Sequence, residues 1–246
     1  MKRSTLYIIG SILILFVWEY FGSTNQITRL LVSSPSLIVE YFINNIESML
    51  NATYVTLLEA VIGLLIATLF SFLMMLVCFY VPKFMEFILP IMITSQVIPL
   101  IVLAPFFIIL MGIGIESKIA MAAIISFFPI FVNFAQGYKS INSRIHEFMD
   151  IQNASLFFRV KRVYFPLSMP SIMAGLKVSA TLAVIGAIVA EFVGAPIGLG
   201  KNMFLAAKRL EPELMMASLI LSTSIGLCLY LSIQLIENKF GKWYKV

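Results

Sequence analysis

Long uncharged apolar runs alternate with short charged segments along this chain. The longest runs cover residues 87–115 with 29 residues, 214–236 with 23 residues and 60–81 with 22 residues. A helix needs about 20 apolar residues to cross the hydrocarbon core of a bilayer. The pattern therefore predicts an all-α polytopic membrane protein with six transmembrane helices. The expected spans are residues 5–22, 60–81, 87–115, 119–138, 172–192 and 214–236.

The third apolar run is interrupted by Pro90, Pro99 and Pro105. Each proline removes a backbone donor and bends or breaks a helix. Broken backbone at membrane depth is tolerated only against protein or a water-filled cavity. We therefore expect this run to form part of a pathway wall. A single kinked and tilted helix fits the same pattern equally well.

A shorter helical pattern follows Ser34-Pro35, where proline takes a favoured first-turn position. From Ile38 to Leu50 the apolar positions trace one helical stripe, and the polar positions lie off it. A short amphipathic helix of this kind lies in the membrane interface. We expect residues 1–50 to hold the first span and this extracytoplasmic interfacial helix. Residues 51–240 would then form a core of five further spans.

The composition excludes a water-soluble globule. The chain is 61% hydrophobic and 12% charged, whereas a soluble domain averages about 25% charged residues. Its net charge of +5 does not indicate nucleic-acid binding, because the basic residues cluster at chain ends and loops. With six spans and both termini in the cytoplasm, eleven basic residues lie inside and five outside, as the positive-inside rule requires. Lys2, Arg29, Lys118, Lys242 and Lys245 are among those counted.

Cysteine and histidine usage adds two expected absences. Cys78 and Cys228 both fall in apolar runs, where free thiols pack as small hydrophobic groups, so we expect no structural disulfide. His146 is the only histidine, and zinc sites use about four clustered ligands. We therefore expect no metal site, and a solvated loop position for His146.

Residues 144–166 form a mixed-charge segment between the fourth and fifth apolar runs. Asn153 sits where a first short helix should stop, and asparagine adopts the left-handed conformation more readily than other non-glycine residues. Ser155 can cap a second helix. The segment therefore predicts two short helices joined at Asn153.

The second of these helices has two different faces at 100° per residue. One face can pack on the membrane or the bundle and comprises Leu156, Phe157, Val160, Val163 and Tyr164. The opposite face mixes aromatic and basic side chains: Phe158, Lys161, Arg162 and Phe165, with Arg159 at its edge. Aromatic residues and arginine are enriched at binding hot spots, which favours docking of a soluble cytoplasmic partner. A basic helix held on anionic headgroups is the open alternative.

The spacing of residues 147–166 carries a family resemblance. Glu147, Asn153 and Pro166 fall at the Glu, Gly and Pro positions of the EAA loop, and Lys161–Pro166 is similar to its Arg-Arg-Val-Val-Leu-Pro ending. Further matches are Ser34-Pro35-Ser36, Leu89-Pro90, Ile98-Pro99, Ala174-Gly175-Leu176, Ala190-Glu191-Phe192 and Gly198-Leu199-Gly200. The chain thus resembles ABC-importer permeases, above all those for aliphatic sulfonates, taurine, nitrate and thiamine-precursor pyrimidines. Phe148 and Met149 replace two alanines of the pattern, and Glu59 stands where relatives commonly carry a basic residue.

The resemblance implies a type I ABC importer permease in the bacterial cytoplasmic membrane, moving a small solute by alternating access. It implies no catalytic residue and no bound cofactor in this chain, with ATP and Mg on a separate ATPase. The implied partners are ATP-binding cassette subunits, an extracytoplasmic binding protein or lipoprotein, a second permease copy and the lipid bilayer, but no nucleic acid. The residues expected to couple the permease to the ATPase are Glu147, Asn153, Phe158, Arg159, Lys161, Arg162, Phe165 and Pro166.

Two other classes of function would leave their own marks in the sequence. A secondary transporter driven by an ion gradient needs ionisable residues at mid-membrane. The candidates Glu59, Lys177 and Glu191 all lie near span ends, where Lys177 and Glu191 can snorkel to the interface. An intramembrane enzyme would show a motif such as HExxH or GxSxG, and the chain contains neither.

The candidate translocation pathway rests on polar or helix-breaking residues inside apolar spans. These are Gln96, Pro99, Asn133, Gln136 and Glu191. Burying an unpartnered polar group in lipid is costly, so such residues favour a polar path. Hydrogen bonds between helices explain Gln96 and Asn133 as well, and an interfacial position explains Gln136 and Glu191.

Overall fold

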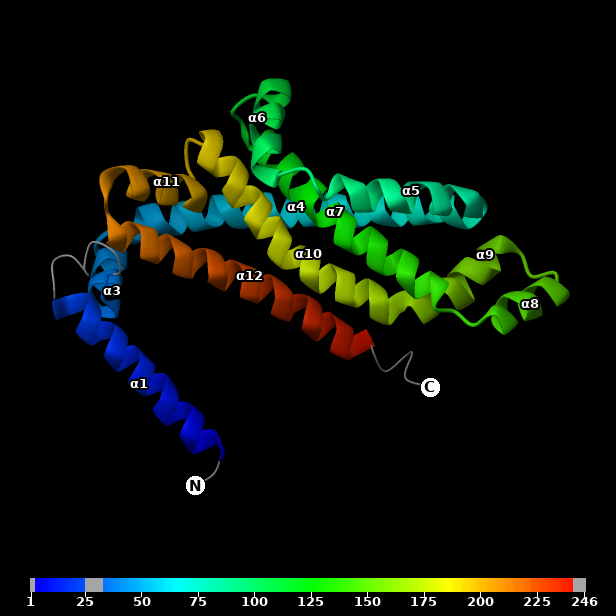
Figure 1. The fold of residues 1–246 in the computed structure, drawn as a ribbon, viewed down its shortest axis with the longest axis horizontal. Helices are drawn as coiled ribbons and strands as arrows, with labels where there is room; N and C mark the ends of the chain where they lie inside the picture. The colour runs from blue at the N-terminus through cyan, green and yellow to red at the C-terminus, as the bar shows by residue number, and fades with distance from the viewer. Residues whose placement is uncertain (1–2, 25–32, 241–246) are drawn as a thin grey trace.

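The computed structural model describes residues 3–24 and 33–240, and within these residues it is all-helical with no β-strand. The helices are α1 (Arg3–Thr24), α3 (Pro35–Asn44), α4 (Ile46–Tyr80), α5 (Pro82–Ser95), α6 (Leu100–Met111), α7 (Ile115–Lys139), α8 (Ser143–Ile151), α9 (Leu156–Arg159), the π-helical turn η1 (Val160–Tyr164), α10 (Phe165–Gly194), α11 (Leu199–Arg209) and α12 (Pro212–Phe240). Figure 1 shows α4, α7, α10 and α12 as an elongated bundle, with α8 and α9 at one end and α11 at the other.

Four helices in the described residues are long and apolar enough to cross a membrane: Ile46–Tyr80, Ile115–Lys139, Leu156–Gly194 and Pro212–Lys239. They contain the second, fourth, fifth and sixth predicted spans. The first predicted span is α1, which has 22 residues, touches α3 and leans away from the bundle (Figure 1). The basic residues Lys2, Arg29, Lys242 and Lys245 lie outside the described residues, so the placement of both termini stays a prediction.

The third predicted span is not one helix, which corrects the simplest six-span interpretation. Gln96–Pro99 separates α5 from α6, and Pro99 takes an extended conformation with ψ 120° just before α6. Pro90 and Pro105 lie inside α5 and α6. The helix breaks at Pro99, which lacks a backbone N–H donor and is also in an extended conformation. The expected interruption of this run is therefore confirmed at Pro99.

The interfacial helix is shorter than its apolar stripe predicted. Asn45 takes a non-helical conformation and ends α3, and the remaining stripe from Ile46 to Leu50 belongs to α4. Because one apolar stripe continues through both helices, the periodicity alone could not reveal the corner. Side-chain bonds hold α1 against α3 and the residues before it: Trp18 Nε1 donates to the Ser33 carbonyl over 3.0 Å, and Ser36 Oγ donates to Glu19 over 2.6 Å.

The core of the bundle is the contact between α7 and α10. Small residues bring the two backbones close, as Ser126 Oγ donates to the Ser179 carbonyl and Ser179 Oγ returns a bond of 2.7 Å to the Ser126 carbonyl. A Cβ on Gly186 would lie 2.8 Å from the Ala122 Cα. Close helix approach through small residues is the usual packing mode in membranes, where apolar side chains gain little from leaving lipid.

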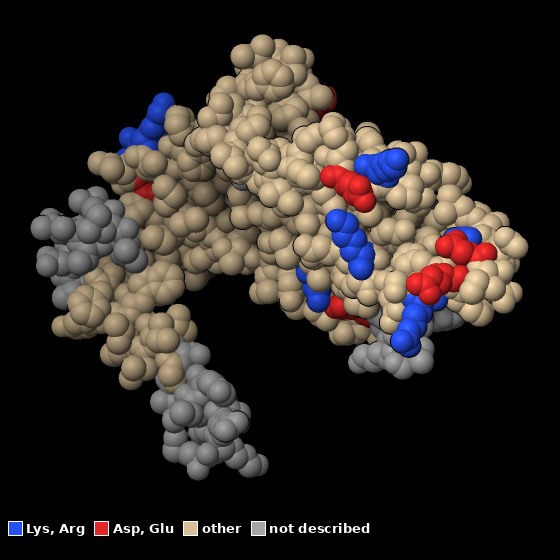
Figure 2. All heavy atoms as spheres, turned by 45° about the vertical axis from the view of Figure 1, so that its right-hand side comes forward, with Lys and Arg blue, Asp and Glu red and all other residues tan. Residues whose placement is uncertain are grey.

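Charged side chains gather toward the ends of the bundle and leave a broad uncharged surface between them (Figure 2). Large apolar side chains are exposed along the helices of the bundle, among them Leu69 and Phe70 of α4 and Ile109 of α6. A surface of this kind is suited to lipid or to another membrane-embedded chain.

Candidate functional site

The candidate coupling site is the corner formed by α8, residues 152–155 and α9, which we call the α8–α9 corner. Asn142 caps α8 by accepting a bond of 3.0 Å from the Arg144 amide. Asn153 has φ 47°, the left-handed conformation, and Ser155 Oγ accepts a bond from the Phe158 amide. The first short helix, the left-handed Asn153 and the Ser155 cap are confirmed, whereas the second helix is not short, because α9 continues through η1 into α10.

Arg159 holds the two sides of this corner together. Its guanidinium pairs with Asp150, and Nε donates to the Ala154 carbonyl over 2.8 Å while Nη2 donates to the Met149 carbonyl over 3.1 Å. The Met149 carbonyl belongs to the last turn of α8 and the Ala154 carbonyl to the link before α9, so these bonds join the two sides of the corner. Arg159 therefore shapes the corner from inside and does not project from its edge.

Aromatic side chains form the base of the corner. Tyr164 is buried, with ring contacts to Phe79, Tyr138 and His146, and its hydroxyl lies 3.2 Å from His146 Nδ1. The expected solvated loop position of His146 is wrong, because this residue lies in α8 and packs against two tyrosines. The spacing of Tyr138, His146 and Tyr164 in sequence gave no sign of this cluster.

Phe165 differs from the helical-wheel prediction. It packs against Phe72 and Phe134, with ring centroids 5.8 and 6.0 Å apart, and belongs to the core that also holds Tyr164. The wheel assumed 3.6 residues per turn, whereas Val160–Tyr164 forms a π-helical turn that rotates the following residues. Phe165 therefore faces the bundle, and its predicted facing toward a partner is wrong.

The outer surface of the corner remains open. Phe158 is 49% exposed, Lys161 and Arg162 are exposed, and Lys161 Nζ lies 5.5 Å from the centre of the Phe157 ring. A groove of 580 Å³ runs between the two helices and is lined by Phe148, Met149, Gln152, Ala154, Ser155 and Phe158. Glu147 is exposed on α8, and Pro166 is half-buried in the first turn of α10. The site thus offers an apolar groove beside basic side chains.

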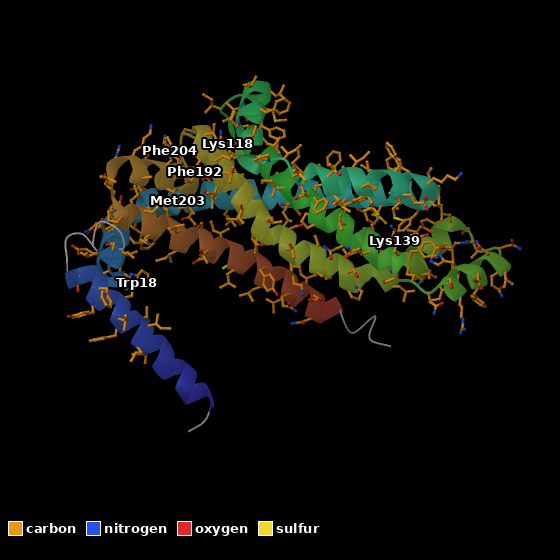
Figure 3. The ribbon with its side chains drawn as sticks, in the orientation of Figure 1. Trp18, Lys118, Lys139, Phe192, Met203 and Phe204 are labelled. Carbon is orange, nitrogen blue, oxygen red and sulfur yellow. The ribbon has the colours of Figure 1, made fainter. Side chains whose placement is uncertain are left out.

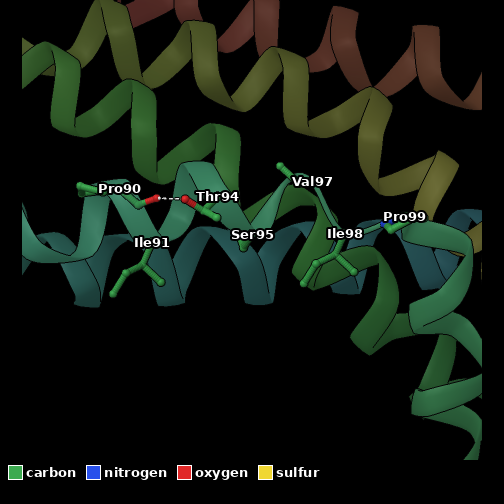
Figure 4. Close-up of a pocket in the computed structure, with 7 residues that line it drawn as sticks. All are labelled: Pro90, Ile91, Thr94, Ser95, Val97, Ile98 and Pro99. Atoms are coloured by element: carbon green, nitrogen blue, oxygen red, sulfur yellow. Dashed lines mark hydrogen bonds between the residues drawn. The ribbon is translucent and has the colours of Figure 1, made fainter.

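The candidate pathway residues are not gathered into one place. Gln96 and Pro99 are exposed in the link between α5 and α6, beside a groove of 770 Å³ lined by Pro90, Ile91, Thr94, Ser95, Val97, Ile98 and Pro99 (Figure 4). On α7, Gln136 is exposed, and the half-buried Asn133 donates a bond of 2.8 Å to the Pro129 carbonyl of its own helix.

Glu191 is neither an open pathway residue nor an interfacial one in this structure. Its side chain is 1% exposed, inside the bundle, where it accepts bonds from Thr56 and Gly200. Glu59 of α4 is 2% exposed and lies against it, and its Oε2 has no hydrogen-bond partner. The predicted exposure of Glu191 to a path or to an interface is wrong.

Lys118, counted in the sequence as an outer-loop residue, is also buried. It lies in the first turn of α7, and its Nζ donates to the Gly194 carbonyl over 2.7 Å and to the Ile113 carbonyl over 2.5 Å. A charged residue in a short link between two apolar runs carries no sequence signal of burial, so the burial of Lys118 could not be predicted. The bonds from Thr56 and Gly200 to Glu191 could not be predicted either.

The chain matches a protein-family model described as "Binding-protein-dependent transport system inner membrane component" over residues 74–242. This match contains α8 to α12, including the whole α8–α9 corner. Among similar proteins, a probable ABC transporter permease protein of Haemophilus influenzae is 31% identical over 96% of this chain and 95% of its own length.

Two further relatives cover most or all of the chain. The formylaminopyrimidine transport permease protein ThiX of Halalkalibacterium halodurans is 31% identical over 100% of this chain and 99% of its own length. The putative aliphatic sulfonates transport permease protein SsuC of Bacillus subtilis is 22% identical over 94% of this chain and 84% of its own length. These relatives favour an ATP-driven ABC importer permease over a secondary transporter acting alone. The chain therefore belongs to the family of binding-protein-dependent transport system inner membrane components, the permeases of ABC importers.

Proposed function

We propose that this permease receives the work of ATP hydrolysis through the α8–α9 corner and moves a small solute across the cytoplasmic membrane by alternating access. The observation that carries the proposal is the continuity of α9, η1 and α10, which form one helix from Leu156 to Gly194. A partner that displaces the exposed Phe158 surface therefore displaces a membrane-spanning helix directly.

The surface of the corner supports docking of a separate ATP-binding cassette subunit. Its groove and half-exposed Phe158 offer an apolar anchor point, and Arg162 adds a basic contact at the rim. Buried aromatic anchors with charged rims are typical of protein interfaces. ATP and Mg would bind to that subunit, and this chain would contribute no catalytic residue. Glu147, Asn153, Lys161 and Pro166 complete the proposed coupling segment, with Arg159 as its internal brace.

We further propose a homodimer of this chain, supplied by an extracytoplasmic binding protein or lipoprotein, with both termini in the cytoplasm. The apolar surface between the bundle ends and the open α5–α6 link support a second copy, because broken backbone at membrane depth must be covered by protein or face a water-filled cavity. In that arrangement Gln96, Pro99, Asn133 and Gln136 would border the pathway.

For the substrate we propose the class of sulfonates, taurine, nitrate and thiamine-precursor pyrimidines. Formylaminopyrimidine is the first solute to test, because the permease named for it is similar over the whole chain. A thermal-shift screen of the cognate binding protein against sulfonates, nitrate, pyrimidines and flavins identifies the ligand. Stabilisation by flavins alone would contradict the proposed class.

The coupling proposal is tested by co-purification and uptake with the paired substitution Phe158→Ala and Arg162→Glu. We expect both association with the ATPase and ATP-driven uptake to be lost. Lys83→Glu, an exposed charge reversal at the start of α5, serves as the control and should leave both intact. Full uptake and unchanged association in the paired variant would refute docking at the corner.

A further inference from the structure

The Gly198-Leu199-Gly200 turn inserts the start of α11 into the bundle. Leu199 is fully buried in a cluster with Ala60 of α4, Ala122 of α7, Ala187 of α10 and Ile225 of α12. Its side chain therefore lies where four long helices meet. Behind it, Met203 and Ala206 continue the buried face of α11, and the ring of Phe204 contacts Phe192 of α10 (Figure 3). α11 closes this end of the bundle.

Two side chains fasten the first amides of α11. Glu191 Oε2 accepts a bond of 2.5 Å from the Gly200 amide, and Oε1 accepts a bond of 2.6 Å from Thr56 Oγ1. Thr56 Oγ1 in turn accepts a bond of 3.0 Å from the Leu199 amide. Thr56 is fully buried and Glu191 nearly so, which protects these bonds from competition by water. One network thus joins α4, α10 and α11.

The backbone of the turn fits closely around this carboxylate. Gly198 has φ 150°, and a Cβ there would lie 2.3 Å from Glu191 Cδ. A Cβ on Gly200 would lie 2.4 Å from the Ile188 carbonyl oxygen, which belongs to the backbone and cannot move aside easily. The glycines therefore allow the direct approach of the α11 amides to Glu191.

Glu191 lies near one end of the 39-residue helix that begins at the α8–α9 corner. At 1.5 Å per residue this helix extends roughly 58 Å. Lys118 fixes its far end to α7 by donating to the Gly194 carbonyl. A displacement at Leu156–Tyr164 therefore reaches Glu191 along one helix, with no loop between the two sites, although Pro166 and Pro170 each remove a backbone donor from it.

We propose that Glu191 is a positioning residue that latches α11 to α10 and to Thr56. Movement of the coupling corner is thereby transmitted to α11, which acts as the extracytoplasmic gate. This proposal rests on the proposed function for the direction of transmission. The latch itself rests on the Glu191, Thr56 and α11 contacts alone, so the two can fail separately.

The latch is tested by hydrogen–deuterium exchange of residues 197–204 in the nanodisc-embedded transporter complex. Glu191→Gln replaces one acceptor oxygen by a donor amide, and Thr56→Val removes the hydroxyl at nearly constant shape. We expect exchange in this segment to become about tenfold faster in both variants, because glutamine offers one acceptor oxygen where the carboxyl group offers two, and valine offers none. Exchange at the wild-type rate would overturn the latch.

Two matched variants separate the latch from general damage. Glu59→Gln replaces the adjacent buried carboxyl, which bonds to neither Thr56 nor Gly200, by an amide of similar shape, and Thr56→Ser retains the hydroxyl. Both should keep wild-type exchange in residues 197–204, and exchange in α7 reports on overall folding. Acceleration in Glu59→Gln equal to that in Glu191→Gln would overturn the specific role of Glu191.

Transmission is tested by adding a non-hydrolysable ATP analogue to the same complexes. In the wild type we expect nucleotide to change exchange in residues 197–204. In Glu191→Gln that response should be lost and uptake should fall at least about tenfold, with the ATPase still co-purifying. Retained nucleotide response and uptake in Glu191→Gln would overturn transmission through the latch. Loss of association in Phe158→Ala with Arg162→Glu tests the corner independently.

Discussion

Lys177 of α10 and Glu237 of α12 form an ion pair between two membrane-length helices, with Nζ 2.8 Å from Oε2. Gln234 Oε1 accepts a second bond from the same Nζ. Lys177 keeps 17% of its side chain exposed, and its partner Glu237 lies one residue past the uncharged run 214–236. The pair therefore braces α10 against α12.

Removing one partner of this pair should destabilise the protein more than removing both. Lys177→Met leaves a carboxylate without its counter-charge, and we expect a cost of about 2 kcal/mol, below that of a fully buried pair because both side chains retain some exposure. Adding Glu237→Leu should restore most of the loss. Thermal unfolding in detergent measures both variants, and additive losses in the double variant would contradict the brace.

The two phenylalanines at either side of the π-helical turn should respond differently to truncation. Phe165→Ala removes contacts with Phe72 and Phe134 and should lower the free energy of unfolding by about 2–3 kcal/mol. Phe158→Ala, at a half-exposed site, should change it by less than about 0.5 kcal/mol while weakening association with the ATPase. Equal thermal shifts in the two variants would show that Phe165 does not belong to the core.

Substitutions at Asn153 test the left-handed turn. Asn153→Gly should preserve stability and uptake, because glycine adopts φ 47° without a steric penalty. Asn153→Val should cost about 1–2 kcal/mol in the corner, since a β-branched side chain disfavours this conformation. Limited proteolysis across residues 151–155, together with uptake, measures the effect. Equal protease resistance of the two variants would argue against the turn.

The close approach of α7 and α10 can be tested with two glycines. Gly186→Ala places a methyl group against the Ala122 backbone and should destabilise the protein by about 1–2 kcal/mol. Gly226→Ala in α12 meets no atom within 4 Å and should leave stability unchanged or slightly raised. Unfolding of the two purified variants makes the comparison. Equal stability would mean that the α7–α10 seam is looser than the structure shows.

The sequence was sufficient to predict the structural features that depend on residues close together in the chain. Four membrane-length helices, an interruption of the third apolar run, the left-handed Asn153 and the Ser155 cap follow from periodicity or from the conformational limits of single residues, but which of three prolines breaks that run does not. These features depend on neighbours within a few positions, so the sequence itself contains their cause. The corner between α3 and α4 was missed because one apolar stripe serves both helices.

Only the tertiary structure decided which polar groups meet. Thr56 and Glu191 are 135 residues apart in the chain, and Thr56 and Leu199 are 143 residues apart. No local pattern contains such pairings, because they arise when α4, α7 and α10 pack through small residues. The direction in which the Phe165 side chain points likewise depended on a π-helical turn, which rotates the residues after it away from their positions on an α-helical wheel. The chain thus determined by itself its membrane-length helices and the turn at Asn153, while packing determined that Glu191 fastens α11 inside the bundle.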